Sequence, residues 1–238
     1  MFHKISRGHK RDLGGRQQLG RRIPIPNNKF HQLVRYVCAG RPIDERYGQI
    51  EDWDVSQVRD MSRAFQNQTT FNRDISRWNT SNVITMERIF DNATSFNQPL
   101  NDWNVSNVTT MACMFLKASS FNQPLNDWDV SGVMSMAGMF CGASSFNQSL
   151  NSWNVSNVTT MKLMFCRASS FNQSLTDWDV RDGTVTLNMF QETNSYNQPL
   201  CGWNSAHSNF SANSLQFNVM LSNWYSQRIS SNSSTSSS

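Results

Sequence analysis

The nine residues WNVSNVTTM stand at 103–111 and return unchanged at 153–161. Such a match inside one chain of 238 residues indicates an internal repeat. Tryptophan sets the period, because seven Trp residues follow one another at intervals of 25 residues. They are Trp53, Trp78, Trp103, Trp128, Trp153, Trp178 and Trp203. Fixed self-similarity at this period predicts a repeat solenoid, in which each repeat forms one coil stacked on the next.

Apolar side chains keep the same step. In the repeat that begins at Trp103, Val105, Met111, Phe115 and Phe121 follow the Trp, and most other repeats have the same residue types at these places. One repeat is too short to bury its own apolar side chains, whereas stacking covers both faces of every coil. The recurring positions therefore predict one continuous core that runs along the stack.

Two phrases predict the local structure of a coil. FNQPLNDWNV (96–105) alternates enough to be extended, which predicts one or two short strands in a parallel ladder. MACMFLKA has its apolar residues at helical spacing, which predicts a short helical turn over 111–118. An Asn also recurs at every period, and stacked Asn residues would form a hydrogen-bonded ladder that satisfies the turn backbone. These structural residues include Asn97, Asn122, Asn147 and Asn172.

The repeats resemble a known family. PLNDWNVSNVTTMACMFLKASSFNQ (99–123) and SLNSWNVSNVTTMKLMFCRASSFNQ (149–173) are similar to the 25-residue repeat of BspA-type leucine-rich-repeat proteins, also called mycoplasma-type lipoprotein repeats. RYGQIEDWDVSQVRDMSRAF (46–65) resembles the usual lead-in to the first repeat. The resemblance implies a leucine-rich-repeat-like solenoid used for adhesion or protein interaction, and it implies no catalytic residues.

The ends of a solenoid need caps, and the sequence predicts five segments. They are a basic flexible arm at 1–26, an N-terminal cap at 27–45, a solenoid of about six repeats at 46–203, a C-terminal cap at 204–226 and a disordered Ser-rich tail at 227–238. The N-terminal cap is predicted to be a helix at about 29–39, with Asn28 as its N-cap and Gly40 as its stop. Cys38 on its apolar face is expected to be a core residue.

Charge is unevenly placed. Residues 1–50 carry eleven Lys and Arg against three acidic residues, whereas the remainder is mildly acidic. The arm's cations lie among Gly, Gln and Ser: Lys4, Arg7, Lys10, Arg11, Arg16, Arg21 and Arg22. Such a segment is expected to bind an acidic protein surface, nucleic acid or an anionic membrane, unless it is only a solvated tail. No apolar run reaches the ~20 residues of a membrane span, so no transmembrane segment is expected.

Catalytic and metal-binding patterns are lacking. The four His lie outside the repeats, and no Gly-rich phosphate loop, paired-Cys motif or nucleophile elbow occurs. Asp pairs such as Asp127 and Asp129 could gather Ca²⁺ between coils, but Asn104 and Asn154 at the equivalent place favour solvated edges. Cys141 and Cys166 share one position in adjacent repeats and are expected to be free thiols near disulfide distance. No catalytic residue, metal or cofactor is therefore expected.

These observations favour a non-enzymatic solenoid that acts as a scaffold for protein–protein interaction. A structural component of a large assembly, such as a minor or accessory capsid protein of a large DNA virus, is the alternative, and a surface adhesin is a second. The N-terminus has no apolar run typical of a secretory signal, which predicts a protein inside a cell or in a particle assembled there, the virion included. The sequons at Asn104 and Asn107 are then by-products of the repeat.

Overall fold

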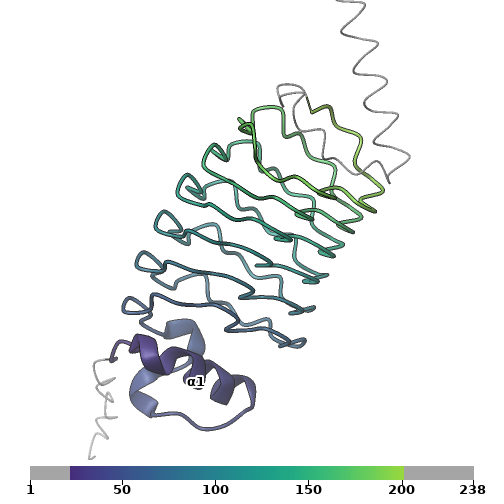
Figure 1. Ribbon diagram of the computed structural model, residues 1–238. Helices are drawn as coiled ribbons and strands as arrows, with labels where there is room; N and C mark the ends of the chain where they lie inside the picture. The colour runs from purple at the N-terminus through teal and green to yellow at the C-terminus, as the bar shows by residue number, and fades with distance from the viewer. Residues whose placement is uncertain (1–21, 201–238) are drawn as a thin grey trace, which may run out of the picture.

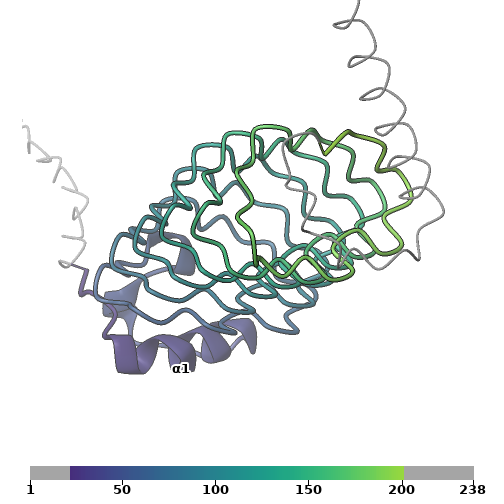
Figure 2. The ribbon, with the colours of Figure 1, turned by 45° about the horizontal axis from the view of Figure 1, so that its top comes forward.

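The computed structural model describes residues 22–200, and Figure 1 shows its architecture. Helix α1 (Asn27–Cys38) comes first, followed by the short 3₁₀ helices η1 (Glu45–Tyr47) and η2 (Ile50–Asp52). Between η2 and residue 200 there is no further helix. This part of the chain forms stacked irregular coils. Helix α1 lies across the N-terminal end of the stack (Figures 1 and 2).

Helix α1 covers the first coils with one apolar face. Phe30, Leu33 and Val34 are buried, and the Phe30 ring meets the Trp78 ring edge-on at 5.8 Å between centroids. The predicted N-cap was wrong, because the cap is Pro26 and Asn28 lies inside the helix. The Pro26 carbonyl accepts the first hydrogen bonds, from the N–H groups of residues 29 and 30. The cap belongs to Pro26 because this residue is extended immediately before the first helical turn.

The side chain next to that cap ties the helix to the coils. Asn27 Oδ1 accepts hydrogen bonds from the backbone N–H of Arg59 at 2.8 Å and of Asp60 at 3.1 Å. The helix ends at Cys38, and Gly40 then takes a φ of +65°, a left-handed conformation that glycine adopts without strain. Cys38 itself is half-buried against the core.

Parallel pairing between coils occurs at one residue per repeat. Bridges join Asp60 to Thr85, and then each residue to its equivalent 25 positions on: Thr85, Thr110, Ser135, Thr160 and Val185. The predicted strands in FNQPLNDWNV do not form, because this segment contributes no bridge. Its Pro99 lacks an N–H to donate, and the Leu100 carbonyl is used within the coil by the Trp103 N–H at 3.0 Å.

The predicted helical turn over 111–118 is also wrong. The apolar residues at the predicted helical spacing are buried, but the segment is a series of tight turns in which Cys113 and Lys117 have φ of 55° and 57°. Their N–H groups donate to Ala137 and Cys141 of the next coil at 2.8 and 2.7 Å. Because these amides pair between coils, they are not available for the i to i−4 bonds of a helix.

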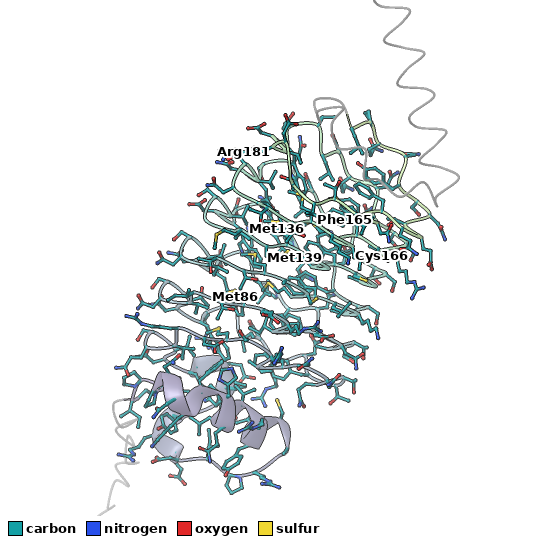
Figure 3. All side chains as sticks on the ribbon, viewed as in Figure 1. Met86, Met136, Met139, Phe165, Cys166 and Arg181 are labelled. Carbon is teal, nitrogen blue, oxygen red and sulfur yellow. The ribbon has the colours of Figure 1, made fainter. Side chains whose placement is uncertain are left out.

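Aromatic columns fill the interior of the stack. Trp78 lies parallel to Trp53 and Trp103 at 6.0 and 6.2 Å between ring centroids, and Phe115 lies parallel to Phe140 at 5.5 Å. Each described indole after the first donates its N–H to a backbone carbonyl of the preceding coil at 2.8–3.1 Å. Figure 3 shows Met86 and Met136 inside the same stack. Each buried Trp therefore has both an apolar contact surface and a partner for its one polar atom.

Candidate interaction surface

One exposed column runs beside the parallel bridges. It consists of the residues six positions after the Trp, together with Val185 in the last described repeat, and we name it the ladder column: Arg59, Ile84, Thr109, Met134, Thr159 and Val185. The backbone N–H of every member after the first donates to the carbonyl of the member before it at 2.8–2.9 Å. This continuous chain of hydrogen bonds holds the six side chains in register.

The ladder column carries exposed apolar side chains. Ile84 is 42% exposed, Met134 is 53% exposed and Val185 is 44% exposed, and within residues 22–200 these are the exposed large hydrophobic side chains. They occur in alternate coils, so neighbouring ones are about 10 Å apart at the usual 4.8 Å spacing of parallel chains. Exposed apolar side chains that gather on one part of a surface are candidates for an interaction site.

The two Thr residues between them add little hydrogen-bonding capacity. Thr109 Oγ1 donates to the Ile84 carbonyl at 3.3 Å, and Thr159 Oγ1 donates to the Met134 carbonyl at 3.0 Å. Both hydroxyl hydrogens are thus used within the stack. The column from residue 84 to residue 185 therefore presents a strip that is poor in free donors.

The edge that carries the Asp and Asn residues after each Trp has a structural explanation. Asp54 and Asp129 accept the backbone N–H of the Ser two residues later at 3.0 and 3.1 Å, and Asn104 and Asn154 do the same at 3.0 and 3.2 Å. Either residue type supports this turn, because the accepting oxygen is common to both. No group of three or more metal-ligating side chains that could hold an ion occurs in the described part of the chain.

The Asn residues proposed as a ladder contact one another through backbone groups. Asn122 Oδ1 accepts the N–H of Asn147 at 2.9 Å and the side-chain amide of Gln148 at 3.0 Å, and Asn97, Asn147 and Asn172 repeat this pattern. The predicted Trp residues are buried in the core from Trp53 to Trp178. Trp203 lies outside the described residues.

Of the seven cations predicted to bind a partner, the structure describes one. Arg22 pairs with Asp52 at 2.8 Å between Nη2 and Oδ2 and donates to the Asp52 carbonyl at 3.0 Å. Arg22 therefore contacts the N-terminal end of the stack. Lys4, Arg7, Lys10, Arg11, Arg16 and Arg21 lie outside the described residues, as do the segments at 204–226 and 227–238.

Sequence reasoning missed the ladder column because its position has no fixed residue type. Arg, Ile, Thr, Met and Val all occur there, so a search for recurring residues passes over it. The sequence signal that could have found the column is a departure from the repeat. An apolar residue at a position that is polar in the neighbouring repeats, such as Met134 between Thr109 and Thr159, indicates a side chain that the core does not require.

Two segments of the chain match the model of a known protein family. The model of a family described as "Mycoplasma protein of unknown function, DUF285" matches residues 39–144 and 123–224, which is well over half of the chain. The chain belongs to this family. The DUF285 match covers every coil described above and supports a repeat protein. No curated protein and no solved structure matches the chain.

The described part of this DUF285 protein has no helix that is both long enough and apolar enough to cross a membrane.

Proposed function

We propose that this chain is a leucine-rich-repeat-like solenoid of the BspA type that binds other proteins and catalyses no reaction. The ladder column is the proposed binding surface, and the stacked coils are its rigid support. The single observation that carries the proposal is the alignment of Ile84, Met134 and Val185, exposed by 42%, 53% and 44%, on one hydrogen-bonded ladder.

Two further observations support a protein partner. All the described Trp and Phe side chains are buried, so residues 22–200 offer no exposed Trp or Phe for stacking sugars or nucleobases. The apolar strip also lies along a regular ladder of backbone hydrogen bonds. An apolar strip with a polar surround is suited to a protein surface of complementary shape.

The test replaces the three apolar side chains together. The triple variant is Ile84→Thr, Met134→Thr and Val185→Thr. It introduces the residue type already found at positions 109 and 159, so the backbone ladder is expected to stay intact. The matched control is Ser95→Ala, Ser145→Ala and Ser195→Ala, which changes three exposed residues of the same three repeats at another position. Tagged chains are isolated from the cells that produce them, and the associated proteins are quantified by mass spectrometry.

We expect the first triple variant to lose at least tenfold of its specifically associated protein, while the control triple variant retains it. Circular dichroism of both variants checks that the coils are still folded. Equal association of both variants with the same proteins would rule out the ladder column as the binding surface.

A further inference from the structure

A pair of thiols lies on adjacent coils. Cys141 and Cys166 both stand thirteen residues after their Trp, and the two thiols are close enough for each to shift the pKa of the other. The backbone N–H of Gly142 donates to the Cys166 carbonyl at 2.7 Å, which fixes the two residues in register. Parallel chains in register are about 4.8 Å apart, within the Cα separation that a disulfide spans. Figure 3 shows Cys166 toward the opposite edge of the stack from Arg181.

Cys141 is the more exposed thiol of the pair. Gly138 and Gly142 have φ of +62° and +72°, and they occupy positions where the next repeat has Leu163 and Arg167. Cys141 is half-buried between these two positions, whereas Cys166 is 6% exposed. A small reagent therefore reaches Cys141 first, and Cys166 is accessible mainly through its partner thiol.

Positive charge lies close to Cys141. A Cβ on Gly142 would lie 3.4 Å from Cγ of Lys117, which places the Lys117 side chain beside the glycine. Arg167 follows Cys166 directly and pairs with Glu192 at 2.8 Å, so part of its charge is compensated. The remaining cationic character favours a reagent that carries carboxylates.

We propose that Cys141 and Cys166 form a dithiol site that takes small anionic disulfides of the glutathione type and closes to a disulfide between two coils. The Cys141 sulfur attacks one sulfur of the small disulfide, whose S–S bond breaks and releases one thiol. The Cys166 sulfur then attacks the Cys141 sulfur, and the second small thiol leaves. Two electrons pass from the protein to the small disulfide, and the two protein protons appear on the released thiols.

The same surroundings make the reaction slow at neutral pH. Burial, which is the largest cause, raises the pKa of Cys141 to about 12, and it also raises the pKa of Cys166. The thiolate is the attacking species, so the rate of closure is expected to rise about tenfold for each unit of pH below the pKa. The pair therefore forms its disulfide slowly and does not react at the rate of a catalytic thiol.

The experiment incubates the full chain with oxidised glutathione between pH 7 and 9 and follows its intact mass and its non-reduced tryptic peptides. We expect the mass to fall by two hydrogens and the peptides that contain Cys141 and Cys166 to be linked. Cys166→Ser should instead stop at a stable mixed disulfide on Cys141. Cys113→Ser is the matched control, because Cys113 lies beside Gly138 in the preceding coil and its loss should leave closure unchanged.

A second arm tests the role of charge. Lys117→Gln should slow the reaction with oxidised glutathione several-fold but leave the reaction with uncharged hydroxyethyl disulfide unchanged. The proposal is overturned if the chain stays fully reduced at pH 9, if it stops at a mixed disulfide, or if Cys141 links to any cysteine other than Cys166. Equal slowing with both reagents would overturn the choice of an anionic disulfide.

Discussion

At the level of single residues, one recurring Asn side chain connects neighbouring coils, and one repeat lacks it. Asn82, Asn107 and Asn157 each donate from Nδ2 to the carbonyl of a Ser in the preceding coil at 2.7–2.8 Å. Gly132 occupies the same position one coil after Asn107, and it has no side chain to donate to the Ser106 carbonyl. The repeat therefore identifies a position at which the chain lacks one of its own stabilising contacts.

Gly132→Asn is expected to stabilise the protein. A Cβ at residue 132 would lie 3.3 Å from the Ser106 oxygen, which is a tight contact, but the Asn residues at the equivalent place in three other repeats fit and reach the Ser carbonyl. The new hydrogen bond should contribute about 1 kcal/mol to the free energy of unfolding. Removing a glycine should add roughly 0.4–1 kcal/mol by restricting the unfolded chain. Denaturant unfolding measures the sum.

Gly132→Ala is the control for that prediction, because it changes the unfolded chain without providing a donor. We expect it to show only the smaller part of the gain. If the Asn variant is no more stable than the Ala variant, the proposed contact with the Ser106 carbonyl does not form.

Among the elements, the segment at 111–118 has the apolar spacing of a helix, but its backbone forms successive tight turns. The buried residues of 111–118 were predictable, because a recurring apolar residue in a repeat points to the core whatever the backbone does. The turns were not predictable, because helical spacing and successive turns both bury residues three and four apart. What decides between them is the hydrogen bond to the next coil, such as Phe115 N–H to Met139 O at 2.8 Å, and a single repeat does not encode it.

This path places non-glycine residues in the left-handed region, and one of them gives a prediction. Lys117 has a φ of 57°, and the two preceding repeats have Asn67 and Asn92 at the same position. Asn tolerates this conformation better than Lys does. Asn92 Nδ2 also donates to Asn67 Oδ1 at 3.0 Å. Lys117→Asn should therefore raise the free energy of unfolding by about 0.5–1 kcal/mol, measured by denaturant unfolding.

The control for Lys117→Asn is Lys162→Asn. Lys162 is also exposed but is not among the residues with positive φ. It should therefore gain nothing from the change. An equal gain at both positions would show that loss of a Lys, rather than the left-handed backbone, is responsible.

At the scale of the whole molecule, the partly buried thiols predict how stability depends on alkaline pH. Burial raises the pKa of Cys38, Cys113, Cys141 and Cys166 above the usual value of 9.0. A raised pKa in the folded state contributes stability that is fully present below the unfolded pKa. We therefore expect the free energy of unfolding to fall as pH rises above 9, in a solution kept reducing.

A variant with Ala at these four cysteines provides the comparison. Its overall stability will be lower, but its stability should fall less between pH 9 and pH 10 than that of the natural chain. Tyr196, whose pKa burial also raises, has an ordinary value of 10.0 and contributes mainly above this window. Identical slopes in the two proteins would contradict the assignment.

The candidate surface shows the limit of the sequence at this scale. The period of 25 residues locates the buried Trp and Phe, since burial imposes the same residue type on every coil. Binding imposes no such repetition, so Ile84 and Met134 become visible only when the ladder places them on one exposed line. Partner binding by the predicted basic arm stays a prediction, because Arg22 is the one cation of the arm that lies in the described residues.

Photo-crosslinking shows directly whether the ladder column contacts a partner protein. A photoreactive amino acid replaces Met134, whose side chain is 53% exposed, and in a second protein it replaces exposed Ser120 of a neighbouring coil. Both proteins are illuminated in the cells that produce them, and the crosslinked peptides are identified by mass spectrometry. We predict that position 134 crosslinks repeatedly to one partner protein and that position 120 does not. Crosslinking to that partner from position 120 alone, or equally from both, would show that the ladder column is not the binding surface.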